Sequence, residues 1–296
     1  MQPIILIAEI LWDEYEDGTQ LLGGSGLNIS WHMQALGAKS YVVSSVGNDK
    51  EGKKFREVAQ AWGISTEYVQ TVKEPTGIVK VVMDEYKKPT YINQEDMAMD
   101  HIHYQDSLKS LPKQSMVYHG TFMLRNSDTG NTIDQLRKMG HPVFMDLNLR
   151  APFWSQEVFD QWVRDLAYLK LSDDELAHLA GNPKMTEKEQ LVWLQQFGKE
   201  KNIENILFTR GAAGSYWIRS DEMFFTDGVK VNVVDTAGAG DAFCAAILFS
   251  LHENLKPQQA LEKASAFAAQ VCTVHGATSH DRDFYLSCLR EIWKKG

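Results

Sequence analysis

The chain has 296 residues, of which 44% are hydrophobic and 23% are charged, a balance typical of folded globular proteins. Its formal net charge is −9 at pH 7, which argues against nucleic acid or an anionic membrane surface as the main partner. A chain of this length forms one large α/β domain or two smaller ones.

The three cysteines, Cys244, Cys272 and Cys288, are scattered and show no C-x-x-C spacing. Such a set argues against a disulfide framework or a zinc site and is expected of a protein in the reducing cytoplasm. Residues 1–18 have no basic segment ahead of the apolar run, so we expect no signal peptide. No apolar stretch approaches the roughly 20 residues that a membrane-spanning helix needs.

Short apolar runs alternate with longer amphipathic segments along most of the chain. Apolar runs typical of buried strands occur at 4–11, 41–47, 115–120, 142–148, 168–172 and 205–208. Amphipathic segments typical of helices occur at 28–37, 51–63, 131–140, 155–167, 173–181 and 186–201. Strands that alternate with helices indicate parallel pairing through right-handed crossovers. We therefore expect a doubly wound α/β fold whose mostly parallel central sheet has helices on both faces.

Residues 76–99 break this rhythm, because two alternating apolar segments follow each other with a polar turn at 84–89 and no helix between them. This pattern predicts an antiparallel hairpin. We expect the hairpin, with residues 12–22, to form a small β lid over a site or a dimer contact, although an ordinary edge meander would give the same pattern. Because no repeat or linker is visible, we expect residues 1–296 to form one principal domain with this β appendage.

A loop of small residues at 235–240 stands between the apolar run VNVV (231–234) and a helix-like run that follows Asp241. Glycine allows unusual backbone angles and the close approach of a ligand. The first N–H groups of a helix have no internal partner and lie at the positive end of its dipole. The sequence therefore predicts a strand, a phosphate-sized anion site and a helix that begins near Gly240 or Asp241.

Two known phosphate-binding loops do not fit this spacing. A Walker A loop needs a lysine that is absent here, and a dinucleotide-binding loop needs a third glycine where Phe243 stands. A tight turn with Asp241 as a helix cap stays open. Alternatively, Asp241 accepts a proton from a hydroxyl that attacks a phosphoryl group held by the loop amides. The helix end would then lower the pKa of Asp241.

Six segments in the right order resemble the motifs of the PfkB (ribokinase-like) carbohydrate kinases, with fructokinases the most similar in pattern. They are GGSGLNISWHMQALGA (23–38), FMDLNLRAPFW (144–154), LKLSDDEL (169–176), FTRGAAGS (208–215), DTAGAGDAF (235–243) and ASAFAAQVCTVHGAT (264–278). The resemblance covers nearly the whole chain. It implies a ribokinase-like doubly wound fold with a β lid, ATP and Mg²⁺ as cofactors, and a small-molecule sugar as the phosphoryl acceptor.

Carried over to this sequence, the resemblance assigns the chemistry to the glycine-rich loop. Asp241 would be the catalytic base that takes the proton of a primary hydroxyl. The amides of Gly238, Ala239 and Gly240 would form the anion hole for the transferred γ-phosphoryl group of ATP.

Two further motifs would bind the nucleotide in such a kinase. Thr209, Gly211 and Gly214 would line its phosphates and ribose. Gly276 and Ala277 would form the turn behind adenine.

The resemblance also implies metal sites. Glu175 would help hold Mg²⁺, largely through water, although it could equally be a first-turn acid of a helix that Ser172 caps. Ser172 stands where the family carries the Asn of its N-x-x-E motif. Asp235 and Thr236, with backbone of the 273–279 turn, could bind a monovalent cation such as K⁺.

The sugar would be read by Asp13, Gly24, Asn28 and Arg150. A carboxylate accepts from sugar hydroxyls, and an amide both donates and accepts. Other roles stay open, because Asp13 could be a solvated loop acid, Asn28 a helix cap, and Arg150 a partner of Asp146.

These residues favour an ATP-dependent sugar kinase with a fructose-type hexose as substrate. Another kinase of the family, acting on 2-keto-3-deoxygluconate, ribose or a nucleoside, is the first alternative. A non-catalytic sugar or nucleotide sensor on the same fold is the second, although a sensor has no need of the base Asp241. A homodimer that pairs through the lid is also consistent with the sequence.

Overall fold

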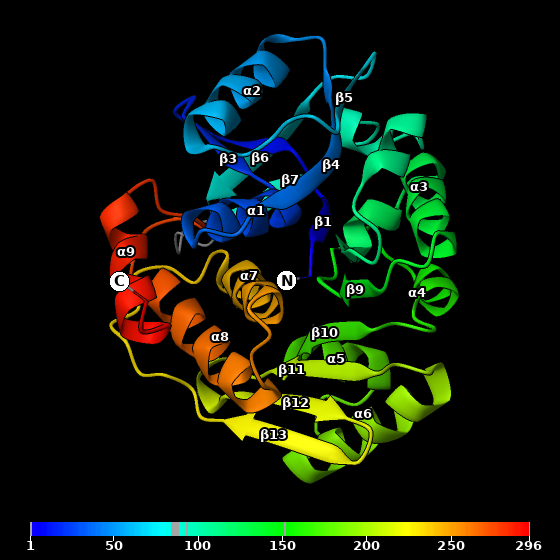
Figure 1. Ribbon diagram of the computed structural model, residues 1–296, viewed down its shortest axis with the longest axis vertical. Coiled ribbons are helices and arrows are strands. Elements are labelled where there is room, and N and C mark those ends of the chain that lie inside the picture. The colour runs from blue at the N-terminus through cyan, green and yellow to red at the C-terminus, as the bar shows by residue number, and fades with distance from the viewer. Residues whose placement is uncertain (1, 84–88, 93, 151, 296) are drawn as a thin grey trace.

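The computed structural model describes residues 2–83, 89–92, 94–150 and 152–295 (Figure 1). Within these residues, nine strands form a central sheet in the order β13-β12-β11-β10-β9-β8-β1-β4-β5. Their bounds are β1 (Ile4–Ile7), β4 (Ser40–Gly47), β5 (Val69–Val72), β8 (Met116–Gly120), β9 (Val143–Asp146), β10 (Tyr168–Ser172), β11 (Asn205–Thr209), β12 (Ser215–Arg219) and β13 (Glu222–Thr226). The strands from β11 to β5 in this order run parallel, whereas β12 and β13 form an antiparallel edge. The predicted mostly parallel sheet is confirmed.

Helices cover both faces of the central sheet (Figure 1). Because successive strand residues point to opposite faces, Ile4 and Leu6 pack into one core, and Ile5 and Ile7 into the other. The first core is completed by α1 (Ser25–Ala35), α2 (Lys50–Trp62), α7 (Ala239–His252), α8 (Pro257–Val271) and α9 (Arg282–Ile292). The second is completed by α3 (Ser127–Lys138), α4 (Gln156–Trp162), α5 (Asp173–Ala180) and α6 (Glu187–Lys201). Short 3₁₀ helices are η1 (Ala98–Asp100), η2 (Asp106–Ser110), η3 (Thr121–Leu124) and η4 (Gly211–Ala213).

A second sheet has the strand order β3-β2-β6-β7. Its strands are β2 (Leu11–Tyr15), β3 (Gln20–Gly23), β6 (Gly77–Met83) and β7 (Pro89–Ile92). β6 and β7 pair antiparallel, as predicted, and β2 joins the hairpin by pairing parallel to β6. The predicted turn at 84–89 falls largely outside the described residues. On one face of this sheet, Trp12 packs under α2 and donates its indole N–H to the carbonyl of Glu51 (3.2 Å).

One local prediction is wrong, and one interpretation that the sequence left open is excluded. Residues 231–234 form no strand, since Val233 and Val234 are exposed and the amide of Val234 bonds only to the carbonyl of Cys272, at the end of α8. The helix α7 begins at Ala239 with Gly238 as its N-cap, so Asp241 is not the cap. A strand needs a neighbour with free backbone groups, and none of the described strands pairs with this segment.

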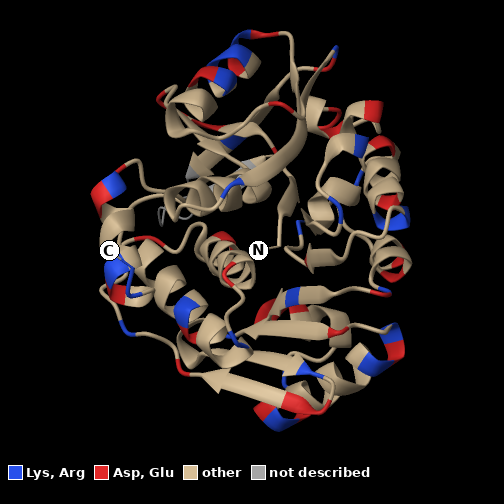
Figure 2. Cartoon of the chain, in the orientation of Figure 1, with Lys and Arg blue, Asp and Glu red and all other residues tan. Residues whose placement is uncertain are grey.

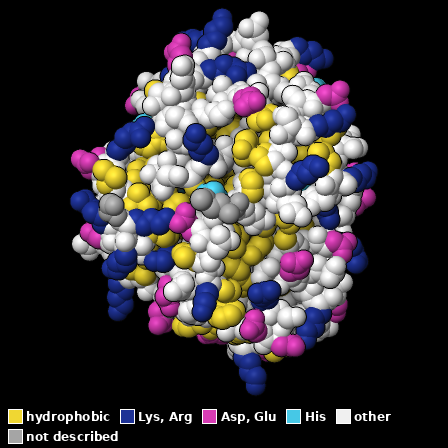
Figure 3. All heavy atoms as spheres, viewed as in Figure 1, with side chains coloured by type: hydrophobic (Ala, Val, Ile, Leu, Met, Phe, Trp, Pro, Cys, Tyr) yellow, Lys and Arg dark blue, Asp and Glu magenta, His cyan; other side chains and the backbone are white. Residues whose placement is uncertain are grey.

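Charges of both signs are interspersed over the outer helices, such as α2 and α6 (Figure 2). On the face in Figure 3, hydrophobic side chains lie mostly in recesses between charged ones. In the part of the chain that the structure describes, none of the helices combines the length and apolar character that crossing a membrane requires.

Candidate active site

The loop before α7 is held in shape by Asp235. One carboxylate oxygen, Oδ1, accepts from the amide of Ala237 and the other, Oδ2, from the amide of Gly276, each at 2.9 Å. Gly238 has a φ of 71°, and a Cβ there would lie 2.5 Å from the Cβ of Ala277. The loop therefore requires glycine at 238 for both its backbone angle and its contact with the neighbouring turn.

The amides at the start of α7 face the region where an anion is predicted. Ala239 N–H bonds to the carbonyl of Thr236 at 3.3 Å, and Ala242 N–H to that of Gly238 at 2.8 Å. Among the described residues, the amides of Gly238 and Gly240 have no protein acceptor. The amide of Asp241 likewise has no acceptor among the described residues, so these N–H groups, at the positive end of the helix dipole, are available to hold a phosphoryl group.

Asp241 lies in the first turn of α7 with both carboxylate oxygens fixed by neighbours from α1. Its Oδ1 accepts from the hydroxyl of Ser25 (2.7 Å) and its Oδ2 from the amide of Asn28 (2.8 Å). Burial raises the pKa of Asp241, and the bonds from Asn28 and Ser25 offset this only partly. The predicted lowering of its pKa by the helix end is therefore wrong, because loss of hydration outweighs the dipole. A raised pKa makes the carboxylate a stronger base.

A buried polar network continues beneath Asp241. Ser25 Oγ lies 3.3 Å from the hydroxyl of Tyr118, which donates to Oδ2 of Asp146 (3.2 Å). Lys170, in β10, pairs with Oδ1 of Asp146 in the adjacent strand β9 (3.0 Å). A Cβ added to Gly240 would lie 3.3 Å from Lys170 Nζ. A buried ammonium group therefore lies close to Gly240, one of the residues predicted to hold the phosphoryl group.

A cavity of about 340 Å³, lined by several charged side chains, opens in front of Asp241. It is lined by all four residues predicted to bind sugar and by several others, which are Asp13, Gly24, Asn28, Arg150, Glu9, Leu11, Ser25, Val79, Phe122, Asn148, Thr236, Ala237, Gly238 and Ala277. Leu11, Asp13 and Val79 come from the second sheet, which thus forms one wall of the cavity. The volume suits a monosaccharide rather than a polymer.

Glu9 lines the first cavity and is not among the residues predicted from the sequence. Its Oε2 accepts from the amide of Gly26 (2.8 Å), and burial raises its pKa to about 6. Burial likewise raises the pKa of Asp13 to about 6, although the charge of Arg150 opposes the shift. Gly24 has a φ of 114°, and a Cβ there would lie 2.3 Å from the carbonyl oxygen of Glu9. Glycine at 24 therefore permits the close packing at the cavity floor.

A second, more apolar cavity of about 380 Å³ lies on the other side of the α7 N-terminus. Thr209, Gly211 and Gly214 line it, as predicted for the nucleotide. Its other lining residues come from η4, from the start of β12, from the loop after β13 and from helices α7 and α8 with the C-cap of α8. They are Ala212, Ser215, Gly228, Val229, Val231, Val233, Thr236, Ala239, Gly240, Phe243, Ser265, Ala268, Ala269 and Cys272. Val231 and Val233 thus line this cavity, where the sequence predicted a strand.

The two cavities meet at residues 236–241. Thr236 lines both, Gly238 and Asp241 face the first, and Ala239 and Gly240 face the second. Ala277 belongs to the first cavity, and Gly276 lines neither. The structure therefore does not bring these last two residues to the wall where adenine is expected.

Glu175 lies outside the lining of both cavities. It forms a capping box with Ser172, whose amide and hydroxyl donate to its Oε2 (2.7 and 3.0 Å). Its Oε1 accepts from the amide of Leu149 (3.0 Å). This is the arrangement of the helix-capping interpretation, and a role for Glu175 in holding Mg²⁺ through water stays a prediction.

A cavity lined by several charged side chains and a second, more apolar cavity meet at a helix N-terminus, with a carboxylate between them, which is the arrangement expected of a phosphotransferase. Residues 11–283 match the model of the pfkB family carbohydrate kinases, and the chain belongs to this family. It is therefore a sugar kinase that transfers a phosphoryl group.

Several relatives are similar along most of the chain. One is an ATP-dependent 6-phosphofructokinase from Thermoanaerobacterium thermosaccharolyticum, 29% identical over 277 residues, with 90% of this chain and 84% of that protein covered. Another is the aminoimidazole riboside kinase of Salmonella typhimurium, 26% identical over 272 residues, with 86% and 83% covered. Among solved structures, the chain is similar to a fructokinase from Vibrio cholerae O395, crystallised in its fructose-, ADP- and calcium-ion-bound form. The TM-score is 0.80 at 24% sequence identity, and the match covers 97% of this chain and 98% of that one. Such structural neighbours show that the fold is ribokinase-like.

Proposed function

We propose that this kinase transfers the γ-phosphoryl group of ATP to a primary hydroxyl of an uncharged sugar, with a fructose-type hexose as the favoured substrate. The observation that carries the proposal is the position of Asp241, at the junction of the two cavities, with the amides of Gly238 and Gly240 beside it. A hydroxyl in the first cavity and a phosphate in the second would meet there.

The residues at this junction support an in-line displacement. Asp241 would take the proton of the attacking hydroxyl, while Ser25 and Asn28 hold both of its oxygens in place. The amides of Gly238 and Gly240, with the ammonium of Lys170 nearby, would stabilise the charge on the transferred group. A β wall closed over the sugar would exclude water, which would otherwise act as a competing acceptor. We therefore propose that the second sheet is a lid within a single kinase domain over residues 1–296.

Two cation sites remain part of the proposal. Mg²⁺ would accompany ATP and neutralise charge on its phosphates. Glu175, which is close enough to the buried Asp146 for its charge to act on that carboxyl group, would contact the ion through water. The negative charge of Asp235, next to Thr236 and the backbone of the 273–279 turn, would suit a monovalent cation such as K⁺. Oxygen donors are the ligands that both ions prefer.

The charge of the first cavity favours an uncharged substrate. Three acids, Glu9, Asp13 and Asp241, face it against one guanidinium group, that of Arg150. A sugar phosphate or a sugar acid would add negative charge to this set, which costs free energy unless cations compensate. We therefore favour fructose over the phosphorylated acceptor that the name of the 6-phosphofructokinase relative implies, and over 2-keto-3-deoxygluconate. Ribose and nucleosides, which are uncharged, stay as alternatives.

The proposal is tested by ADP release from ATP and Mg²⁺ with a panel of acceptors. The panel contains fructose, fructose 6-phosphate, ribose, a nucleoside and 2-keto-3-deoxygluconate. We expect the highest kcat/KM with fructose. A higher value with fructose 6-phosphate would refute the argument from charge, and binding without turnover for every acceptor would favour a sensor.

We also propose a homodimer that pairs through the lid and a location in the cytoplasm. Leu21, Val82 and Ile92 are large apolar residues of the second sheet that stay exposed in the single chain, which suits a contact with another copy. The three cysteines are free and buried, as expected in a reducing compartment. Light scattering should show a dimer for the parent chain and a monomer for Leu21→Lys. A parent chain that is monomeric in this measurement would refute the proposed dimer.

A further inference from the structure

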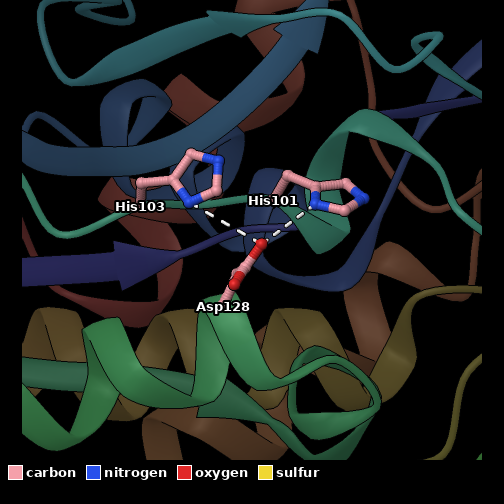
Figure 4. A group of neighbouring side chains, drawn as sticks. All are labelled: His101, His103 and Asp128. Carbon is pink, nitrogen blue, oxygen red and sulfur yellow. Dashed lines mark hydrogen bonds and ion pairs between the residues drawn. The ribbon is translucent and has the colours of Figure 1, made fainter.

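Two histidines and an aspartate converge on the surface, and none of them lines either cavity. His101 and His103 lie between η1 and η2, and Asp128 lies in the first turn of α3. Both imidazole rings face the carboxylate of Asp128 from the same side (Figure 4). His101 Nδ1 lies 3.1 Å from Asp128 Oδ2, and His103 Nδ1 lies 3.7 Å from the same oxygen.

A fourth residue fixes the ring of His101. Its Nε2 lies 2.6 Å from Oδ1 of Asp96, on the side away from Asp128. With the proton on Nε2, His101 donates to Asp96 and its Nδ1 lone pair faces Asp128. In the metal-free chain a second proton, on Nδ1, would donate to Asp128, and a cation that binds there would take the place of that proton. Metal-binding histidines use this arrangement, in which the second ring N–H donates to a carboxylate outside the coordination sphere.

The two ligand spacings that involve Asp128 suit a small transition-metal ion, and all three ligand atoms lie within 4.8 Å of one another. Bonds of about 2.0–2.1 Å in a tetrahedral site place neighbouring ligand atoms about 3.3 Å apart, and the distances of 3.1 and 3.7 Å lie on either side of this value. We propose that His101, His103 and Asp128 bind a divalent transition metal such as Zn²⁺, with Asp96 orienting His101. The half-exposed His103 leaves a fourth position to water.

The mixed donor set separates this site from the ion that accompanies ATP. Imidazole nitrogen suits zinc, copper and nickel, whereas Mg²⁺ and Ca²⁺ prefer oxygen ligands alone. The bound ion would fasten the segment after β7, which carries Asp96, to the first turn of α3. We therefore expect metal binding to raise the thermal stability of the chain by mass action.

The same segment supports a wall of the sugar cavity. Asp100, next to His101, pairs with Arg125 through two bonds of 2.5 Å. The guanidinium of Arg125 lies 4.3 Å from the ring centre of Phe122, which lines the cavity. The proposed ion thus lies beside a structural contact of the active site without touching the reacting groups.

The test is calorimetric titration of the chelator-treated, full-length chain, freed of any histidine tag, with ZnCl₂ and separately with MgCl₂, in the absence of ATP and sugar. We expect one zinc site that magnesium does not occupy. His103→Asn should weaken zinc binding at least about tenfold, and Asp96→Asn about 10- to 100-fold. His280→Asn is the matched control, because this histidine is exposed and outside the cluster; its zinc affinity should equal that of the parent.

Two results would overturn the metal site. One is the absence of zinc binding by the parent chain. The other is equal zinc affinity in the parent, His103→Asn and Asp128→Asn, which would place any bound zinc elsewhere. Thermal unfolding without metal checks that the variants fold. Because no substrate is present, failure of this test leaves the proposed kinase activity unaffected.

Discussion

The buried pair between Lys170 and Asp146 gives a prediction whose size follows from the structure. The two groups lie 3.0 Å apart, and the residues are only 6% and 1% exposed. Lys170→Met would leave the carboxylate buried without its counter-charge, which typically costs about 3–5 kcal/mol. Tyr118 and Cys244 still donate to the other carboxylate oxygen, so we expect the lower end, about 3 kcal/mol in the free energy of unfolding. At roughly 2 °C per kcal/mol, the melting temperature should fall by about 6 °C.

The assay is urea unfolding of the parent and of matched variants. Lys199→Met is the control, because Lys199 pairs with Asp221 at a similar distance of 3.1 Å but its side chain is 66% exposed; its loss should cost at most about 1 kcal/mol. In Lys170→Met combined with Asp146→Asn, the stranded charge is gone, so the cost should be less than the sum of the single changes. Equal costs for Lys170→Met and Lys199→Met would refute the reasoning.

Three further predictions concern the two cavities. Gly24→Ala places a Cβ 2.3 Å from the carbonyl oxygen of Glu9 at a φ of 114°, and this strain should raise the sugar KM about tenfold or more while the ATP affinity is retained. Steady-state kinetics measure both, and an unchanged sugar KM would contradict the role of Gly24 in shaping the sugar cavity. Glu9 and Asp13, whose pKa values burial raises to about 6, lose hydrogen-bond acceptors when protonated, so kcat/KM for the sugar should fall as pH drops through about 6; a flat profile between pH 5 and 8 contradicts this. Ala269→Phe should fill part of the second cavity and raise the ATP KM, while sugar binding, measured by tryptophan fluorescence, should change little. Weaker sugar binding with an unchanged ATP KM would indicate that the second cavity binds the sugar.

The glycine-rich loop was predictable because its chemistry is local. Backbone angle and close approach explain the glycine at 238, whose positive φ and contact with Ala277 appear in the structure. The alternation of apolar runs and amphipathic segments likewise predicted the parallel sheet, since burial on both faces fixes that pattern. The S-x-x-E spacing of Ser172 and Glu175 also indicates a capping box at the start of a helix, and the structure has this capping box at the start of α5.

The rest of the site depends on contacts between distant segments. The sequence shows a charged residue within each of two apolar runs, Glu9 in IILIAEIL and Lys170 in YLKLS. Their hydrogen-bond and ion-pair partners depend on which elements are adjacent in the fold, and the sequence does not show this. Ser25 reaches Asp241 across 216 residues of sequence. Hydrophobicity alone does not distinguish a strand from a cavity wall, so the apolar run at 231–234 predicts a strand where the structure has part of the second cavity's wall.

The role of Asp241 is tested most directly by the turnover of Asp241→Asn, measured beside its affinities for ATP and sugar. The variant keeps the size of the side chain and removes its basicity. We expect kcat to fall about 10²- to 10⁴-fold, the usual contribution of acid–base catalysis, while both affinities stay within severalfold of the parent values. A kcat close to that of the parent would show that another group takes the proton and would contradict the proposed mechanism.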